Sequence, residues 1–215
     1  HDYPPSKIKV IENGIDIDSL TENAPQKHAK TVKKNNYRIG IAGRLVPVKR
    51  VDLFIQTAVN LKQHNPELSI DFHIYGDGPL HDVLQNQVQS QQAGNYIHFE
   101  GHCGSMSQEL QKLDALVMTS DHEGLPMILL EAMCQRVPVI AHAVGGIPHL
   151  LNQGKCGILV ADHSPEAFAE AIIRLTANPE QCQEMTGQAF KRIEQLYSAR
   201  HTTSHYLDTY KEIIS

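Results

Sequence analysis

Two glutamates, Glu123 and Glu131, lie eight positions apart on either side of a Gly-Leu-Pro turn. The apolar run Ala115–Met118 before them predicts a buried strand, and Pro126 predicts the first turn of a helix, where its missing amide costs nothing. The other amides at that helix start would form an anion site, and Glu131 would lean back toward it. Since two acids would repel an anion, we interpret them as acceptors for hydroxyl groups beside it, as in a phosphate that carries a sugar on each side. The alternative is that Glu123 only caps the helix and that Glu131 is a solvated helix residue.

Two basic residues, Arg44 and Lys49, follow the predicted strand Tyr37–Ala42 and precede an apolar pattern with helical spacing. They are the basic side chains nearest to a strand end and a helix start, so they could neutralise a diphosphate. The alternative is that both only face solvent. Glycines, which let a backbone approach a ligand closely, also follow predicted strands; they are Gly43, Gly76, Gly78, Gly101, Gly124, Gly145 and Gly146.

Strand patterns alternate with helical patterns along most of the chain. The predicted strands are Tyr37–Ala42, Ile70–Tyr75, Ile97–Phe99, Ala115–Met118, Pro138–Ala141 and Gly157–Val160. This alternation predicts parallel pairing with right-handed crossovers, and therefore an α/β fold: a doubly wound, Rossmann-like sheet of about six strands with helices on both faces. Ligands of such sheets bind beyond the carboxyl ends of the strands, where the basic residues, the glycines and the glutamates would meet.

The chain divides into three predicted parts. Residues 1–36 form a strand at Lys7–Ile11 and a polar, lysine-containing linker. Residues 37–198 form the sheet domain, whose last two helices begin at Pro165 and Pro179. Residues 199–215 hold a final helix from Thr203, with an apolar stripe that needs a partner surface. Because the Lys7–Ile11 strand has nothing before it to pair with, we expect the chain to be a fragment of a longer protein.

Composition limits the class of protein. The net charge is −5, and no basic run suggests binding to nucleic acid. No apolar run approaches the ~18 residues of a membrane span and no signal peptide opens the chain, so we expect a soluble, cytoplasmic protein. Four widely spaced cysteines fit free thiols in a reducing compartment. The turn from Gly76 to Pro79 lacks the third glycine of a dinucleotide fingerprint. Two histidine pairs have helical i, i+4 spacing, but His98/His102 spans a strand end and a glycine, and His201/His205 has no carboxylate or cysteine nearby at ligand spacing. We therefore interpret them as surface histidines and expect no metal.

Six short motifs occur in a particular order and spacing. They are Gly43-Arg44-Leu45 with Lys49, Gly76-Asp77-Gly78-Pro79, Phe99-Glu100-Gly101, Ser120 with Glu123-Gly124-Leu125-Pro126 and Leu130-Glu131-Ala132-Met133, Pro138-Val139-Ile140, and Gly145-Gly146-Ile147-Pro148. Together they resemble the C-terminal, donor-binding half of the retaining GT-B glycosyltransferases of the large "group 1" family. Each motif alone is weak, but the resemblance runs from Pro5 to the end of the chain.

The resemblance implies roles for individual residues. Arg44 and Lys49 would hold the donor diphosphate, Glu123 would contact the transferred sugar, and these three would carry the catalysis. Glu131 would bind the ribose hydroxyls, and Gly101 and His102 would border the nucleobase. The implied donor-binding set is Gly43, Arg44, Lys49, Gly78, Gly101, His102, Glu123, Gly124, Leu125, Met127 and Glu131. Many relatives have Phe-Gly where this chain has Leu125-Pro126, and a proline nitrogen cannot donate a hydrogen bond.

The implied function is transfer of a hexose from a UDP- or GDP-sugar to an acceptor, with retention of configuration and without a metal or other cofactor. The sugar or lipid-linked acceptor would be bound mainly by a missing N-terminal half. That half would also cover the helix of residues 199–215, support any peripheral membrane association, and be required for activity in polysaccharide biosynthesis. Two alternatives remain. One is a nucleotide-sugar 2-epimerase of the same fold. The other is a non-catalytic, receiver-like nucleotide-binding or regulatory module. A receiver would have an acidic cluster after its first strand, whereas Gly43-Arg44 at that place is basic.

Overall fold

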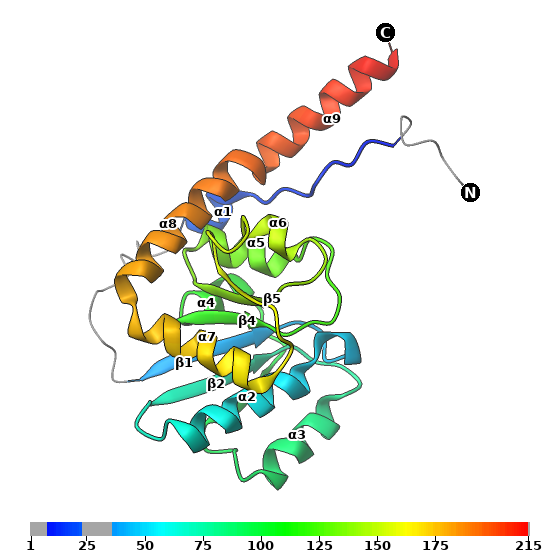
Figure 1. Ribbon diagram of the computed structural model, residues 1–215. Coiled ribbons are helices and arrows are strands. Elements are labelled where there is room, and N and C mark those ends of the chain that lie inside the picture. The colour runs from blue at the N-terminus through cyan, green and yellow to red at the C-terminus, as the bar shows by residue number, and fades with distance from the viewer. Residues whose placement is uncertain (1–7, 23–35, 215) are drawn as a thin grey trace.

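The computed structural model describes residues 8–22 and 36–214. Its centre is one parallel sheet of six strands in the order β3-β2-β1-β4-β5-β6, with helices on both faces (Figure 1). The strands are β1 Tyr37–Ala42, β2 Ile70–Tyr75, β3 Ile97–Gly101, β4 Ala115–Met118, β5 Val139–His142 and β6 Ile158–Val160. The predicted doubly wound α/β sheet is therefore confirmed.

Helices connect and cover these strands. They are α1 Ile17–Thr21, the 3-10 helix η2 Pro47–Lys49, α2 Val51–His64, α3 His81–Ser90, α4 Met106–Leu110, α5 Met127–Cys134, α6 Ile147–Leu150, α7 Pro165–Ala177, α8 Pro179–Leu196 and α9 Ala199–Ile214. One hydrophobic core lies between the sheet and α2 with α7, and contains Phe54, Phe72 and Phe168. The other lies under α5 and α8, and contains Leu130 and Tyr197. The two cores pack the helices against opposite faces of the sheet.

The strand order reverses at β1, which pairs with β2 on one side and with β4 on the other. The connections that leave β1 and β4 therefore run to opposite faces of the sheet, and a crevice opens between them beyond the carboxyl ends of the strands. The loop with Arg44 and Lys49 follows β1, and the loop with Glu123 follows β4. The topology thus brings the predicted cations and acids to one place.

Two predicted details were wrong. Pro126 is not in the first helical turn: its backbone is extended, with ψ 112°, and it forms the N-cap of α5, which begins at Met127. Residues 8–11 form no strand, because no neighbouring strand lies beside them to accept hydrogen bonds; Lys7 lies outside the described residues. The chain instead joins the domain at Ile15, whose amide donates to Tyr197 O at 2.8 Å and whose carbonyl accepts from Ala199 N at 2.8 Å.

The predicted linker also contains a short helix. The Asp16 carboxylate caps α1 by accepting a hydrogen bond from Ser19 N at 3.2 Å, a local signal that the polar composition of the stretch had hidden. The lysine-rich part of the linker, residues 27–34, lies outside the described residues.

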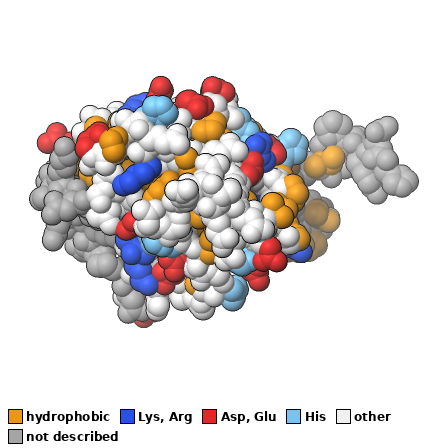
Figure 2. Space-filling view, turned by 90° about the horizontal axis from the view of Figure 1, so that it is seen from below, with side chains coloured by type: hydrophobic (Ala, Val, Ile, Leu, Met, Phe, Trp, Pro, Cys, Tyr) orange, Lys and Arg blue, Asp and Glu red, His pale blue; other side chains and the backbone are white. Residues whose placement is uncertain are grey.

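Helix α9 begins at Ala199, four residues before the predicted Thr203, and it extends away from the sheet (Figure 1). None of its described residues is buried, and its large apolar side chains are exposed: Tyr206, Leu207, Tyr210, Ile213 and Ile214. The division into domains and the partner surface for α9 stay predictions. Across residues 8–22 and 36–214, no helix is long and apolar enough to span a bilayer. Figure 2 shows acidic, basic and histidine side chains interspersed on one face of the molecule.

Candidate functional site

A cleft of about 620 Å³ lies beyond the carboxyl ends of β1 and β2, and the first turns of α5 form one of its walls. Of the residues predicted from the sequence, the cleft brings together Gly43, Arg44, Lys49, His102, Glu123, Met127 and Glu131. These residues come from four separate loops and helices, so only the folded sheet can place them side by side. The cleft is therefore the candidate site.

Four predicted residues lie outside the lining of the cleft. Gly78 packs on the backbone of Leu45, where a Cβ atom would come within 2.5 Å of the Leu45 oxygen, so it supports the loop that carries Arg44. The carbonyl of Gly101 accepts a hydrogen bond from Gly76 N at 2.7 Å. Gly124 lines an adjoining hollow, and Leu125 packs on the core beneath α5. Their predicted contacts with a donor stay predictions.

The cleft is also lined by Gly76, one of the glycines expected at this edge of the sheet, and by residues that the sequence patterns did not assign to it: Ala42, Tyr75, Asp77, Cys103, Met106, Pro126 and Ile128. Tyr75 ends β2, burial raises its pKa to about 12, and its hydroxyl donates a hydrogen bond to Glu109 Oε2 at 3.4 Å. Its position as the last residue before a glycine turn was a signal in the sequence. Cys103 and Met106 gave no such signal, since they lie in an irregular loop and a five-residue helix.

Lys49 and Glu123 are bonded to each other. The Lys49 Nζ atom lies 2.6 Å from Glu123 Oε1, and the Glu123 side chain is only 9% exposed. The predicted phosphate-binding cation and the predicted sugar-binding acid therefore neutralise one another across the cleft. A diphosphate must compete with Glu123 for Lys49, a coupling that sequence spacing could not indicate.

This ion pair leads to a prediction about nucleotide binding. Replacement Glu123→Gln removes the competitor for Lys49, so affinity for a nucleoside diphosphate without sugar should rise about fivefold, the effect of a partly exposed ion pair of ~1 kcal/mol. Isothermal titration with UDP at low salt measures the change, with Asp208→Asn, which removes an acid paired with Lys211 on α9, as the matched control. Unchanged or weaker UDP binding by Glu123→Gln would contradict the competition.

Glu131 differs from Glu123 because its carboxylate has no hydrogen-bond partner among the described residues. It lines the cleft from the second turn of α5, and burial raises its pKa. A half-buried acceptor without a protein partner is poorly satisfied. It is therefore ready to accept hydrogen bonds from a ligand's hydroxyl groups.

The raised pKa of Glu131 also predicts a dependence of stability on pH. A carboxyl group whose pKa is higher in the folded state favours folding below its unfolded pKa, and this contribution is lost as the pH rises through the folded pKa. The neutral variant Glu131→Gln should therefore melt at a higher temperature than the wild type at pH 7. Differential scanning calorimetry at pH 7 and pH 4 tests this, since the difference should disappear at pH 4. A lower melting temperature at pH 7 would contradict it.

Arg44 is exposed at the mouth of the cleft, and its guanidinium has no hydrogen bond or ion pair with other described residues. Beside it, Lys49 ends the helix η2. On the facing side, Pro126, Met127 and Ile128 at the start of α5 line the cleft, although the Pro126 nitrogen has no hydrogen to donate. Two cations, one of them paired, and a helix N-terminus thus surround the same space.

The loop that carries Glu123 packs against the glycine pair Gly145 and Gly146. A Cβ atom on Gly145 would lie 1.8 Å from Glu123 O, and one on Gly146 would lie 2.2 Å from Gly124 O. Gly145 also has a φ of 54°, which side chains disfavour. The amide of Gly146 donates to Glu123 O at 3.2 Å. Both glycines are therefore required for the two loops to touch.

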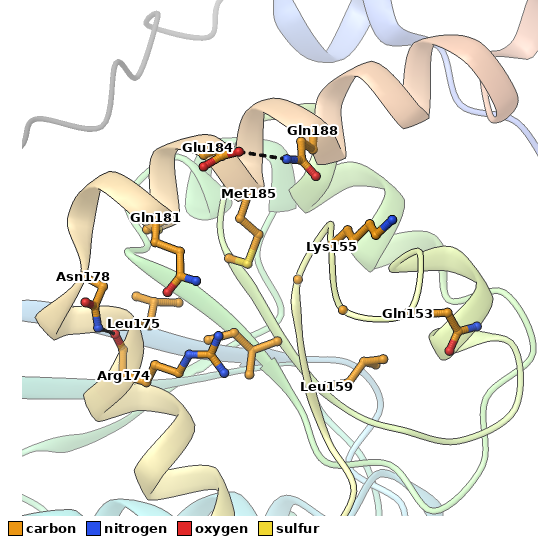
Figure 3. Close-up of a pocket in the computed structure, with 14 residues that line it drawn as sticks. Gln153, Lys155, Leu159, Arg174, Leu175, Asn178, Gln181, Glu184, Met185 and Gln188 are labelled. Carbon is orange, nitrogen blue, oxygen red and sulfur yellow. Dashed lines mark hydrogen bonds between the residues drawn. The ribbon is translucent and has the colours of Figure 1, made fainter.

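A second hollow, of about 470 Å³, lies beside β6 between α7 and α8. Figure 3 shows Arg174, Gln181 and Met185 reaching into it, while Glu184 accepts a hydrogen bond from Gln188 at 3.2 Å. This hollow shares no residue with the cleft, and no predicted site residue lines it. Within residues 8–22 and 36–214, no three His, Cys, Asp or Glu side chains are grouped so that they could hold a metal ion.

Comparisons with known proteins point to one family. Residues 23–192 match the family described as "Glycosyl transferases group 1". The chain is 28% identical over 204 residues to the poly(ribitol-phosphate) alpha-N-acetylglucosaminyltransferase of Staphylococcus aureus (strain COL), covering 93% of this chain and 40% of that protein. It is 25% identical over 215 residues to the D-inositol 3-phosphate glycosyltransferase of Paenarthrobacter aurescens (strain TC1), covering 97% and 52%. The chain thus spans about half the length of the curated relatives it matches.

A solved structure is similar as well. A crystal structure of Staphylococcus aureus TarM in complex with fondaparinux, alpha-GlcNAc-glycerol and UDP superposes with a TM-score of 0.80 at 25% identity, covering 93% of this chain and 38% of that chain.

Proposed function

This chain belongs to the glycosyl transferases of group 1, and we propose that it is their nucleotide-sugar-binding part. The whole protein would transfer a hexose from a nucleoside diphosphate to an acceptor with retention of the anomeric configuration. The observation that supports this best is the cleft itself, in which two cations, a helix N-terminus and two carboxylates surround one space. Retention rests on the family resemblance.

Arg44, Lys49 and the first amides of α5 are the groups proposed to bind the donor diphosphate. When the bond to the sugar breaks, negative charge develops on the leaving phosphate, and fixed donors and cations around it stabilise that charge. The guanidinium of Arg44 would bind first, because it has no partner to give up among the described residues. Lys49 would follow as Glu123 releases it. Charge neutralisation by these protein groups needs no metal ion in this proposal.

The two glutamates would each bind one sugar of the donor, the ribose or the transferred hexose. Glu131, half-buried and without a partner among the described residues, would accept hydrogen bonds from the ribose hydroxyls. Glu123, once separated from Lys49, would accept them from the transferred sugar. His102 and the backbone at Gly101 would border the base, and the amides of Leu125 and Met127, with the backbone of Gly43, Gly78 and Gly124, would complete the site.

The partners of the site follow from the relatives only as proposals. A UDP-sugar is the donor we propose first, since UDP is bound in the TarM structure, and a GDP-sugar is the second choice. The names of two relatives contain polyol phosphates, so we propose an acceptor of that kind or a related sugar, bound mainly by a further domain. Four free cysteines among the described residues fit a reducing compartment, which supports a cytoplasmic location, with any contact to the membrane surface made through that further domain.

The experiment that tests the proposed function is a thermal-shift and calorimetric panel of UDP, GDP and ADP, each with and without an attached sugar. One nucleoside diphosphate should raise the melting temperature, and its sugar conjugate should raise it further. Incubation with UDP-N-acetylglucosamine alone should leave that donor unchanged, whereas an epimerase would isomerise it. Absence of binding across the panel at millimolar concentration would contradict the proposal.

A further inference from the structure

Two histidines outside the cleft form a stacked pair. The rings of His142, the last residue of β5, and His163, between β6 and α7, are parallel within 3° with centroids 3.8 Å apart. His142 Nδ1 lies 2.9 Å from Ser120 O, and His163 Nε2 lies 2.6 Å from Thr119 O. Because a carbonyl oxygen can only accept, each of these nitrogens must carry the proton.

The two carbonyls belong to consecutive residues at the end of β4. Thr119 and Ser120 are almost completely buried, with exposed fractions of 0% and 1%. Buried carbonyls need partners, and beyond Met118 the pairing of β4 with β5 has ended, so the backbone of a neighbouring strand no longer supplies them. The two imidazoles supply the missing donors, each to one carbonyl.

The segment held in this way leads directly to Glu123. His163 Nδ1 lies 3.4 Å from Asp121 Oδ1, and Arg50 Nη1 contacts the same oxygen at 3.4 Å. The amide of Asp121 donates to Val48 O at 2.8 Å. Two residues further on, Glu123 reaches Lys49 across the cleft. The path of this backbone therefore decides where the Glu123 carboxylate can lie.

We propose that His142 and His163 are positioning residues for the sugar-binding carboxylate of Glu123. They touch neither the cleft nor the donor, and they act by holding the Thr119 and Ser120 carbonyls, so that the loop leaves β4 in one direction. This inference rests on the proposed function for the role of Glu123, but the holding of the loop does not depend on it. Carboxylates that must meet particular hydroxyls need such a supporting layer.

The test uses variants that separate ring packing from hydrogen bonding. His142→Phe and His163→Phe keep an aromatic ring but lose the donor. His142→Asn places an amide nitrogen near the Nδ1 position, and His163→Gln places one near Nε2, so both should restore the bond. The exchanged variants, His142→Gln and His163→Asn, carry the same amide groups but place the nitrogen where it does not reach the carbonyl. They should therefore behave like the Phe variants. His205→Phe alters an exposed histidine of α9 and is the control.

Two measurements report on these variants. The first is hydrogen exchange of the amides of residues 121–124 without ligand, which should become about tenfold faster in the Phe and exchanged variants and return toward wild type in His142→Asn and His163→Gln. The second is calorimetric affinity for UDP and for UDP-glucose. The Phe and exchanged variants should bind UDP at least as tightly as wild type, by up to the roughly fivefold gain expected of Glu123→Gln, but lose most of the affinity that the attached sugar adds.

The outcomes distinguish the inference from the proposed function. If wild type gains no affinity from the sugar, the role of Glu123 in the proposed function fails, and loop exchange still decides whether the histidines hold the loop. Unchanged exchange in the Phe variants overturns the inference. Equal weakening of UDP and UDP-glucose binding in the Phe variants also overturns it. The same holds if His142→Asn and His163→Gln restore neither the slow exchange nor the added affinity of the sugar. Where a Phe variant does not fold, the comparison between the matched and exchanged amides decides the same question.

Discussion

Residues 1–215 alone should bind a nucleoside diphosphate sugar and transfer none of its sugar to any acceptor. Transfer needs the acceptor hydroxyl held in line with the anomeric carbon, and such positioning can supply about 7–11 kcal/mol of the barrier. In the proposed function the charges and acceptors of the cleft all serve the donor, and the cleft is open to solvent. The chain also spans about half the length of its curated relatives, so a further domain is the expected source of acceptor binding.

The measurement is transfer of radiolabelled sugar to simple polyol phosphates and sugars. This chain should stay at background, and the full-length protein should rise several orders of magnitude above it. Donor affinity should be weaker in the isolated chain, because an open cleft leaves the ion pairs in water, where they are screened. Robust transfer by residues 1–215 alone would show that the acceptor site lies within them.

Arg44→Ala should weaken binding of a nucleoside diphosphate about tenfold or more. A hydrogen bond between a charged donor and phosphate contributes about 1.5–3 kcal/mol, and Arg44 gives up no bond to make it, since it has no partner among the described residues. Lys49→Ala should have a smaller net effect, because the phosphate must first break the pair between Lys49 and Glu123.

Isothermal titration with UDP distinguishes these two effects. Arg200→Ala, which removes another exposed arginine at the start of α9, serves as the control and should bind like wild type. Wild-type affinity in both Arg44→Ala and Lys49→Ala would show that neither residue binds the diphosphate. A larger loss for Lys49→Ala than for Arg44→Ala would mean that Glu123 orients Lys49 for the ligand and does not compete with it.

The sheet could be predicted because its signals are local. Each strand is a short apolar run followed by glycine or a polar turn, and each helix has its own apolar spacing. The rule that ligands bind beyond the carboxyl ends of parallel strands then placed Arg44, Lys49, Glu123 and Glu131 together without any contact being known. The start of α5 was misplaced by one residue because proline usually occupies the first helical position, whereas Pro126 has an extended backbone and precedes the helix.

Contacts between distant residues could not be predicted in the same way. The bond between Lys49 and Glu123 joins residues 74 positions apart. It depends on how two loops lie across the cleft. The stacked rings of His142 and His163 were missed for a related reason, since neither residue has a neighbour in the sequence that marks it. Residues 8–11 looked like a strand because alternation reports side-chain pattern and not the presence of a pairing partner.

A titration of the ¹⁵N-labelled chain with UDP, followed by amide chemical shifts, tests most directly whether the cleft beyond β1 and β2 is the donor site. We predict that the largest changes occur at Gly43, His102, Met127 and Ile128, which line the cleft. We also predict that Gly154 and Leu159, in the hollow beside β6, do not respond. Changes centred on that hollow, with the amides of the cleft unmoved, would contradict the assignment.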